Sequence, residues 1–84
     1  MSWNHRVVVT EDGTHQVAEV FYSEAGKPIS WGKTVTLAES VDELTGATEE
    51  KLHGYLLWAV RECTKALYLP VLYVRNGELT EVKE

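Results

Sequence analysis

One amphipathic stretch in the second half of the chain constrains the fold more than any other feature. From Glu49 to Leu67, apolar residues recur at intervals of three and four positions, which places them along one side of an α-helix. This stripe consists of Leu52, Tyr55, Leu56, Ala59, Val60, Cys63 and Leu67. Because 84 residues suffice for one hydrophobic core and not for two, we expect a single domain over residues 1–84.

The segments before the helix are typical of β-strands. Residues 6–10 are rich in β-branched side chains, and an Asp-Gly pair follows that has the backbone freedom a tight hairpin needs. Residues 15–23 predict a second strand that carries apolar groups on both faces. A third strand is expected over residues 28–37, where Gly32 marks either a bulge or close packing against another backbone. The predicted apolar face of this strand carries Ile29, Trp31, Lys33 and Val35.

The start of the helical region is open to two interpretations. Ser40 and Glu43 have the spacing of a capping box, which predicts a helix that begins there. Gly46 then interrupts the helix at a cost of about 1 kcal/mol relative to Ala. Thr48, followed by two acids, offers a second start. The sequence is compatible with one kinked helix or with two consecutive helices.

The segment after the helix predicts a second hairpin. Pro70 ends the helical region, and residues 71–75 and 78–82 are typical of strands. They flank Asn76-Gly77, the strongest short signal for a two-residue hairpin. The order of elements is therefore β-β-β-α-β-β. We expect an α+β fold in which a small, curved, mostly antiparallel sheet packs on one main helix.

Charge and composition oppose several classes of function. Eight Lys and Arg against thirteen Asp and Glu give a formal charge of -5, and the basic residues never form a run, which opposes binding to nucleic acid. No apolar run approaches the roughly 20 residues that cross a bilayer, which opposes a membrane role. Cys63 has no second cysteine to pair with, and the N-terminus lacks the pattern of a signal peptide, so we expect a cytoplasmic protein.

The reactive side chains form no recognisable catalytic or metal-binding spacing. The candidate soft ligands are His5, His15, His53 and Cys63. His53 and Cys63 are about 15 Å apart along the helix, too far to share one ion. We expect exposed histidines and a buried Cys63, and burial of that thiol opposes a Cys–His catalytic pair. We therefore expect no cofactor, no metal ion and no catalytic residue.

Three Trp residues supply large rigid surfaces for a core or for a binding site. Trp58 and Leu57 lie off the centre of the helix stripe, so they are candidates for contact with another chain. A stacked or cation-π contact between Trp3 and Arg6 is a further hypothesis. The predicted partner-binding residues are Leu57, Trp58 and Arg61, with Trp3 and Trp31 as secondary candidates.

Short blocks of the chain resemble a widespread set of small bacterial and archaeal proteins. The blocks are Ser2-Trp3-Asn4-His5-Arg6-Val7, Glu19-Val20-Phe21-Tyr22, Gly26-Lys27-Pro28 with Trp31, and Ala66-Leu67 with Pro70-Val71-Leu72. That set typically opens with Ser-Trp-Asn-Tyr-Arg-Val, so His5 stands where Tyr is usual, and the stretch between Val41 and Leu52 is longer here. Its members carry no established activity to transfer. In element order alone, the chain is similar to the partial ribonuclease-H-like domain of HicB-type antitoxins, which implies partner binding.

The leading hypothesis is a small non-enzymatic interaction module. It would self-associate as a homodimer or bind a protein partner through the outer helix face and apolar sheet positions. A second hypothesis is an acidic inhibitor of the phage or mobile-element type, which would occupy the basic groove of a nucleic-acid-handling protein through Asp42, Glu43, Glu49 and Glu50. A third is a minimal enzyme or metabolite-binding protein with a pocket between protomers around His15, Tyr22 and Trp31.

Overall fold

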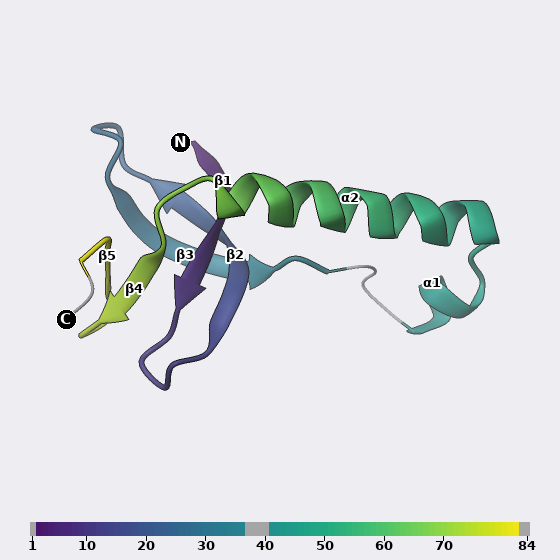
Figure 1. Cartoon of the computed structure of the whole chain (residues 1–84), viewed down its shortest axis with the longest axis horizontal. Coiled ribbons are helices and arrows are strands. Elements are labelled where there is room, and N and C mark those ends of the chain that lie inside the picture. Colours follow the sequence, from purple (N-terminus) through teal and green to yellow (C-terminus); the bar gives the residue numbers. More distant parts are fainter. Residues whose placement is uncertain (1, 37–40, 83–84) are drawn as a thin grey trace.

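The computed structural model describes residues 2–36 and 41–82, within which a five-stranded sheet is joined to two helices (Figure 1). The elements are β1 (Trp3–Val9), β2 (His15–Tyr22), β3 (Pro28–Thr34), α1 (Val41–Thr45), α2 (Glu49–Leu67), β4 (Leu72–Arg75) and β5 (Glu78–Thr80). The strand order is β3-β2-β1-β4-β5, and all neighbours are antiparallel except β1 and β4, which run parallel. The predicted α+β class, with a mostly antiparallel sheet and one main helix, is confirmed.

Two tight turns form where the sequence predicts them. Asn76 and Gly77 both have positive φ, 51° and 77°, as a two-residue turn between antiparallel strands requires. In the turn between β1 and β2, Gly13 has a φ of 87°, and the Asp12 carboxylate accepts hydrogen bonds from the Thr10 hydroxyl and the Thr14 N–H. Both hairpins are thus determined by local turn chemistry.

Two bulges in β3 break the side-chain alternation predicted for this strand. One extra residue lies between Trp31 and Thr34, so the bulge is the correct alternative at Gly32, and a second lies between Pro28 and Ser30. Each bulge shifts the pairing by one residue and so exchanges the two faces of the strand. The residues of β3 that pair with core-facing residues of β2 are Pro28, Trp31 and Thr34. The prediction that Ile29, Trp31, Lys33 and Val35 share one face is therefore wrong, and the predicted strand end near residue 37 lies outside the described residues.

The hydrophobic core lies on the inner side of a curled sheet. The edge strands β3 and β5 contact each other, so the five strands curve around a common interior. Its buried residues are Val8, Ala18, Val20, Leu72, Val74 and Leu79, and Tyr22 and Trp31 pack against them. Every one of these residues comes from a strand, so this core forms without α2.

α2 packs on the opposite, outer side of the sheet, against β1. Successive residues of a strand point to opposite sides, so His5 faces α2 while Arg6 and Val8 face the inner side. Thr48 is the N-cap of α2, and its hydroxyl accepts a hydrogen bond from the N–H of Lys51 at 3.2 Å.

The interpretation with two consecutive helices is correct. α1 ends at Thr45, and the N–H of Gly46 donates to the Asp42 carbonyl at 3.0 Å before the chain turns into α2. Ser40, the cap predicted for the earlier helix, lies outside the described residues.

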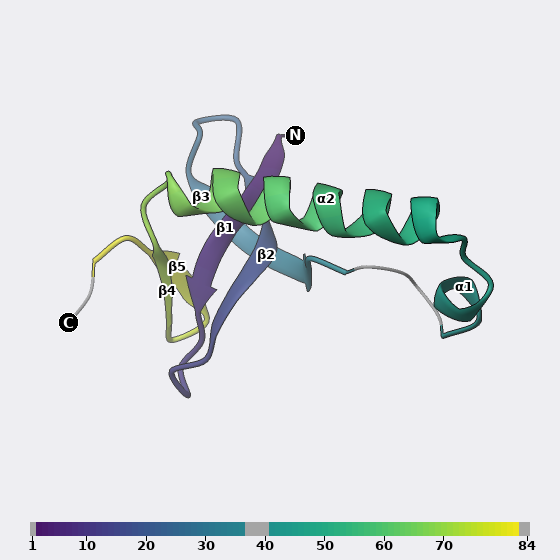
Figure 2. The same cartoon turned by 45° about the vertical axis from the view of Figure 1, so that its right-hand side comes forward.

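Much of α2 extends beyond the sheet. Figures 1 and 2 show that the C-terminal end of α2 lies over β1, whereas its N-terminal half and α1 project away from the strands. We call this projecting part, α1 together with residues 49–57 of α2, the arm. The radius of gyration is 14.7 Å, whereas a compact chain of this length has one of about 12 Å. The whole of α2 is described, and Ala66 is its one buried residue.

Candidate functional site

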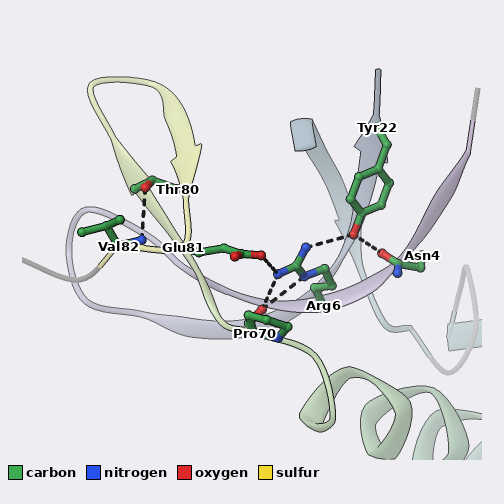
Figure 3. Close-up of polar contacts among 7 residues, drawn as sticks. All are labelled: Asn4, Arg6, Tyr22, Pro70, Thr80, Glu81 and Val82. Atoms are coloured by element: carbon green, nitrogen blue, oxygen red, sulfur yellow. Dashed lines mark hydrogen bonds and ion pairs between the residues drawn. The ribbon is translucent and has the colours of Figure 1, made fainter. Parts of the chain in front are cut away.

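A cluster of polar side chains ties the last part of the chain to β1 (Figure 3). The Arg6 guanidinium donates from Nε and Nη2 to the Pro70 carbonyl oxygen, at 3.2 and 2.6 Å. Its Nη1 donates to the Tyr22 hydroxyl at 3.2 Å, and Nη2 also donates to Glu81 Oε2 at 2.9 Å. The Tyr22 hydroxyl donates in turn to Asn4 Oδ1 at 2.7 Å. We call Asn4, Arg6, Tyr22, Pro70 and Glu81 the Arg6 cluster.

The Arg6 cluster stabilises the fold. Burial alone would lower the pKa of Arg6, but hydrogen bonds with Tyr22 and Glu81 outweigh it and raise that pKa above its ordinary value. All three guanidinium nitrogens already have partners within the chain. A buried Arg whose donors are satisfied in this way joins structural elements rather than offering a ligand site.

The hypothesis of a stacked or cation-π contact between Trp3 and Arg6 is wrong. Positions three apart on a strand point to opposite sides of the sheet, so Trp3 lies on the outer side and Arg6 on the inner side. Trp3 instead contacts His5 edge to face, with ring centroids 5.4 Å apart and an angle of 89° between the rings.

His5 joins α2 to the sheet. Its ring is buried between Trp3 and Trp58, and the centroid of the Trp58 ring is 5.9 Å away. His5 Nδ1 lies 2.8 Å from Glu62 Oε1, and because a carboxylate can only accept, Nδ1 carries the proton and donates. Lys65 Nζ donates to the other carboxylate oxygen at 3.2 Å. The prediction of exposed histidines is therefore wrong for His5, and its pairing with Glu62 was not predicted.

The contact between His5 and Glu62 makes stability depend on pH. The hydrogen bond from His5 lowers the pKa of Glu62 below its ordinary value of 4.5, burial opposes this, and Lys65 lowers it further. A carboxyl whose pKa is lower in the folded state stabilises the fold above about pH 4.5, and this contribution is lost as pH falls through the folded-state value. The Glu62 side chain is 18% exposed, so the stabilisation is on the order of 1 kcal/mol.

We expect Glu62→Gln to remove this stabilisation at about pH 7 and to differ less from the wild type at about pH 3. Urea denaturation of both proteins at the two pH values measures the difference. Glu24→Gln, at an exposed loop position, is the matched control. A difference between wild type and Glu62→Gln that is equally large at both pH values would contradict the ionic contact.

An exposed line of large aliphatic side chains runs along α2. Leu56, Val60 and Leu67 are 54%, 61% and 73% exposed. Successive helical residues are about 100° apart, so these three lie within about 40° of one another around the helix axis. They point about a quarter turn away from Ala66, which faces β1. We call Leu56, Val60 and Leu67 the apolar strip.

The apolar strip belongs to the predicted helix stripe, but the sheet leaves it uncovered. The side of α2 that meets β1 carries Trp58 and Glu62, which contact His5, together with buried Ala66. One part of the stripe is therefore presented to solvent. The exposed residues of this part could not be recognised from the periodicity, which does not tell which side of a wide stripe a sheet will cover.

The structure brings some of the predicted partner-binding residues together and separates others. Leu57 and Arg61 are one helical turn apart and exposed, and around the helix they lie between the apolar strip and Trp58. Trp58 and Trp3 meet around His5, and each is about half exposed. Trp31 packs against the inner core, so it lies on the other side of the sheet from α2.

The acidic residues of the inhibitor hypothesis lie in the arm. Asp42 and Glu43 fall in the first turn of α1, and Glu49 and Glu50 in the first turn of α2. Acids at these positions complement the positive end of a helix dipole. Their position therefore has a structural reason that requires no ligand.

The residues of the third hypothesis do not meet within one chain. His15 and Tyr22 lie at opposite ends of β2, about 23 Å apart at 3.3 Å per residue. The Tyr22 hydroxyl is engaged in the Arg6 cluster, and His15 Nδ1 lies 3.0 Å from the Gly13 carbonyl oxygen. An open hollow of about 370 Å³ lies elsewhere, at the ends of β1 and β4. It is lined by Val9, Thr10, Glu11, Tyr73, Val74, Arg75 and Asn76.

His5, His53 and Cys63, the remaining candidate metal ligands, have three different surroundings. His5 is bound to Glu62, His53 is exposed on the arm, and Cys63 is half-buried on α2. Over residues 2–36 and 41–82, no three His, Cys, Asp or Glu side chains gather closely enough to hold a metal ion. In the same part of the chain, no helix has the length and apolarity needed to cross a lipid bilayer.

The apolar strip and the residues beside it are thus the surface with the clearest functional character. Beside it lie Leu57 and Arg61, and Arg is among the residues enriched where proteins bind one another. The resemblance to small prokaryotic proteins and the topological similarity to HicB-type antitoxins stay predictions. Comparison of the chain with protein-family models, with curated proteins and with solved structures found no match in any of the three.

Proposed function

We propose that the chain is a small non-enzymatic protein-interaction module that works in the cytoplasm. Its binding surface is the apolar strip of α2, with Leu57 beside it. Trp58 lies on the opposite side of the helix, against His5. The observation that supports this function is the exposure of three large aliphatic side chains along one line of a helix that buries Ala66 alone. Monomeric soluble proteins rarely expose large contiguous apolar patches, and such large patches mark interaction sites.

The arm strengthens the same proposal. Helices of fewer than about 12–15 residues are marginal in water, and most helical stability in proteins comes from packing of the apolar face. The arm extends beyond the strands, so the sheet does not supply that packing to its first turns (Figure 2). Leu56 is the residue of the apolar strip that lies in the arm, so a binding partner that covers it would supply part of that packing.

Val60→Asp is the sharpest test of this surface. Val60 is 61% exposed and contacts neither the inner core nor His5, so a charge there removes binding while the fold remains. Trp58→Ala is less suitable, because the Trp58 ring also packs against His5. Lys51→Asp is the matched control, since it introduces the same acid at an exposed position almost opposite Val60 on the helix.

Each of the three proteins is immobilised and exposed to nuclease-treated host lysate, or to added copies of the wild-type chain. We expect wild type and Lys51→Asp to retain the same proteins. We expect Val60→Asp to lose them. Capture is compared at about 0.1 M and about 1 M salt, since an apolar interface withstands salt that screens charges. Proteins that all three baits retain equally would argue against the apolar strip. Capture that disappears at high salt with every bait would favour the acidic inhibitor instead.

A further inference from the structure

The accessible surface of the chain is larger than a compact monomer of its size has. The chain exposes 6123 Å², whereas a compact monomer of this mass exposes about 5,000 Å² by the usual scaling of area with mass. The excess of about 1,000 Å² is close to the roughly 800 Å² that each partner contributes to a standard protein interface. The excess reflects the projecting arm, and a partner that covered the arm would bury an area of this order.

Charges are distributed unevenly along α2. The first turn carries Glu49, Glu50 and Lys51, a net charge of -1, whereas Arg61, Glu62 and Lys65 in the last two turns give a net charge of +1. Two parallel copies of this helix would place like charges side by side. Two antiparallel copies would place the acidic end of each beside the basic end of the other and would align their helix dipoles favourably.

The apolar residues fit the antiparallel arrangement. A two-fold axis that passes close to Leu56 brings this residue against Leu56 of the second copy. The same axis brings Val60 level with Leu52 of the second copy, so apolar side chains meet on both sides of the axis. On the flank, it brings Glu50 to within one residue of the level of Arg61 of the second copy, because the two positions lie six and five residues from Leu56.

We infer that the partner bound by the apolar strip is a second copy of this chain, with the two α2 helices antiparallel about a two-fold axis near Leu56. This inference rests on the proposed function, since it names the partner of the same surface. The sheets would lie at opposite ends of the helix pair, because each sheet is attached near the C-terminal end of its own α2. The dimer interface would cover the arm of each copy.

Sedimentation velocity of the purified full chain from about 1 to 200 µM tests the inference, because that range detects dimers of micromolar affinity. We expect the wild type and Lys51→Asp to dimerise. Val60→Asp should raise the dissociation constant at least about 30-fold, the effect of losing one central apolar contact. Far-UV circular dichroism checks that each variant keeps its helix.

Charge reversal tests the antiparallel orientation separately. We expect Glu50→Lys and Arg61→Glu each to raise the dissociation constant by about 5-fold to 10-fold, because each creates two like-charged pairs. The double variant restores both pairs and should return to within about 3-fold of the wild type. Failure of the double variant to recover would overturn the antiparallel pairing.

These experiments distinguish failure of the dimer inference from failure of the proposed function. A wild-type chain that stays monomeric over the whole range overturns the second copy as the partner. So does a dimer that Val60→Asp leaves intact. The proposed function then depends only on whether Val60→Asp abolishes capture of another protein, and it fails if neither association nor capture responds to that variant.

Discussion

Arg6→Ala is expected to lower the free energy of unfolding by about 3 kcal/mol. The substitution removes both hydrogen bonds to the Pro70 carbonyl, the donor to the Tyr22 hydroxyl and the ion pair with Glu81. Hydrogen bonds to a charged group contribute about 1.5–3 kcal/mol where they are buried, and the vacated space adds a further cost. Urea denaturation measures the loss, with the slope of the transition as a check that the folded state is otherwise unchanged.

Two companion variants identify the source of that loss. Arg6→Lys keeps the charge but has no planar fork, so it should recover less than half of the stability. Glu81→Gln should cost less than about 1 kcal/mol, because the Glu81 side chain is 54% exposed and its ion pair is accessible to water. If Glu81→Gln were as damaging as Arg6→Ala, the contacts with Pro70 and Tyr22 would contribute nothing.

Leu72→Ala is expected to destabilise the chain by about 2–5 kcal/mol. Leu72 has no exposed surface, lies in the inner core and pairs with Val8 where β1 and β4 run parallel. The lost transfer energy and the cavity left behind both contribute. For a domain of this size, each 1 kcal/mol shifts the melting temperature by about 4–8 °C, so a thermal melt followed by circular dichroism resolves the effect.

Leu67→Ala is the matched control for this prediction. It removes the same atoms from a side chain that is 73% exposed, and substitutions at such positions usually change stability by less than about 0.5 kcal/mol. The comparison is made in dilute protein, so that association through the apolar strip does not contribute. Equal losses for Leu67→Ala and Leu72→Ala would show that the inner core is not where the fold is stabilised.

Helices and turns that are determined by residues close together in the sequence could be predicted. α2 begins at Glu49 and ends at Leu67 as its periodicity indicates, and the turn at Asn76-Gly77 follows from two residues that tolerate positive φ. The partner-binding prediction named Leu57 and Arg61 on α2, next to the surface proposed here, and it stays a prediction. It did not single out Val60, because the same spacing would have buried Val60 had α2 been rotated by a quarter turn.

Contacts between distant parts of the chain could not be predicted. The rotation of α2 depends on His5 and Glu62, which are 57 positions apart, and this polar pair holds the side with Trp58 and Ala66 against β1. Arg6 is buried because its donors meet a carbonyl oxygen at Pro70, which no composition rule indicates. The bulges of β3 were only half predicted, because Gly32 marks one of them and no Gly marks the other.

The Arg6 cluster has a consequence for synthesis on the ribosome. Arg6 and Glu81 are 75 positions apart, so at the usual 5–20 residues per second their partnership has to wait about 4–15 s after Arg6 is made. β1 can pair with β2 early, but its parallel partner β4 is also made late. The nascent chain thus carries an unfinished sheet with a charged side chain on its inner side until the last strands arrive. That charge discourages premature pairing of the open edge with other chains.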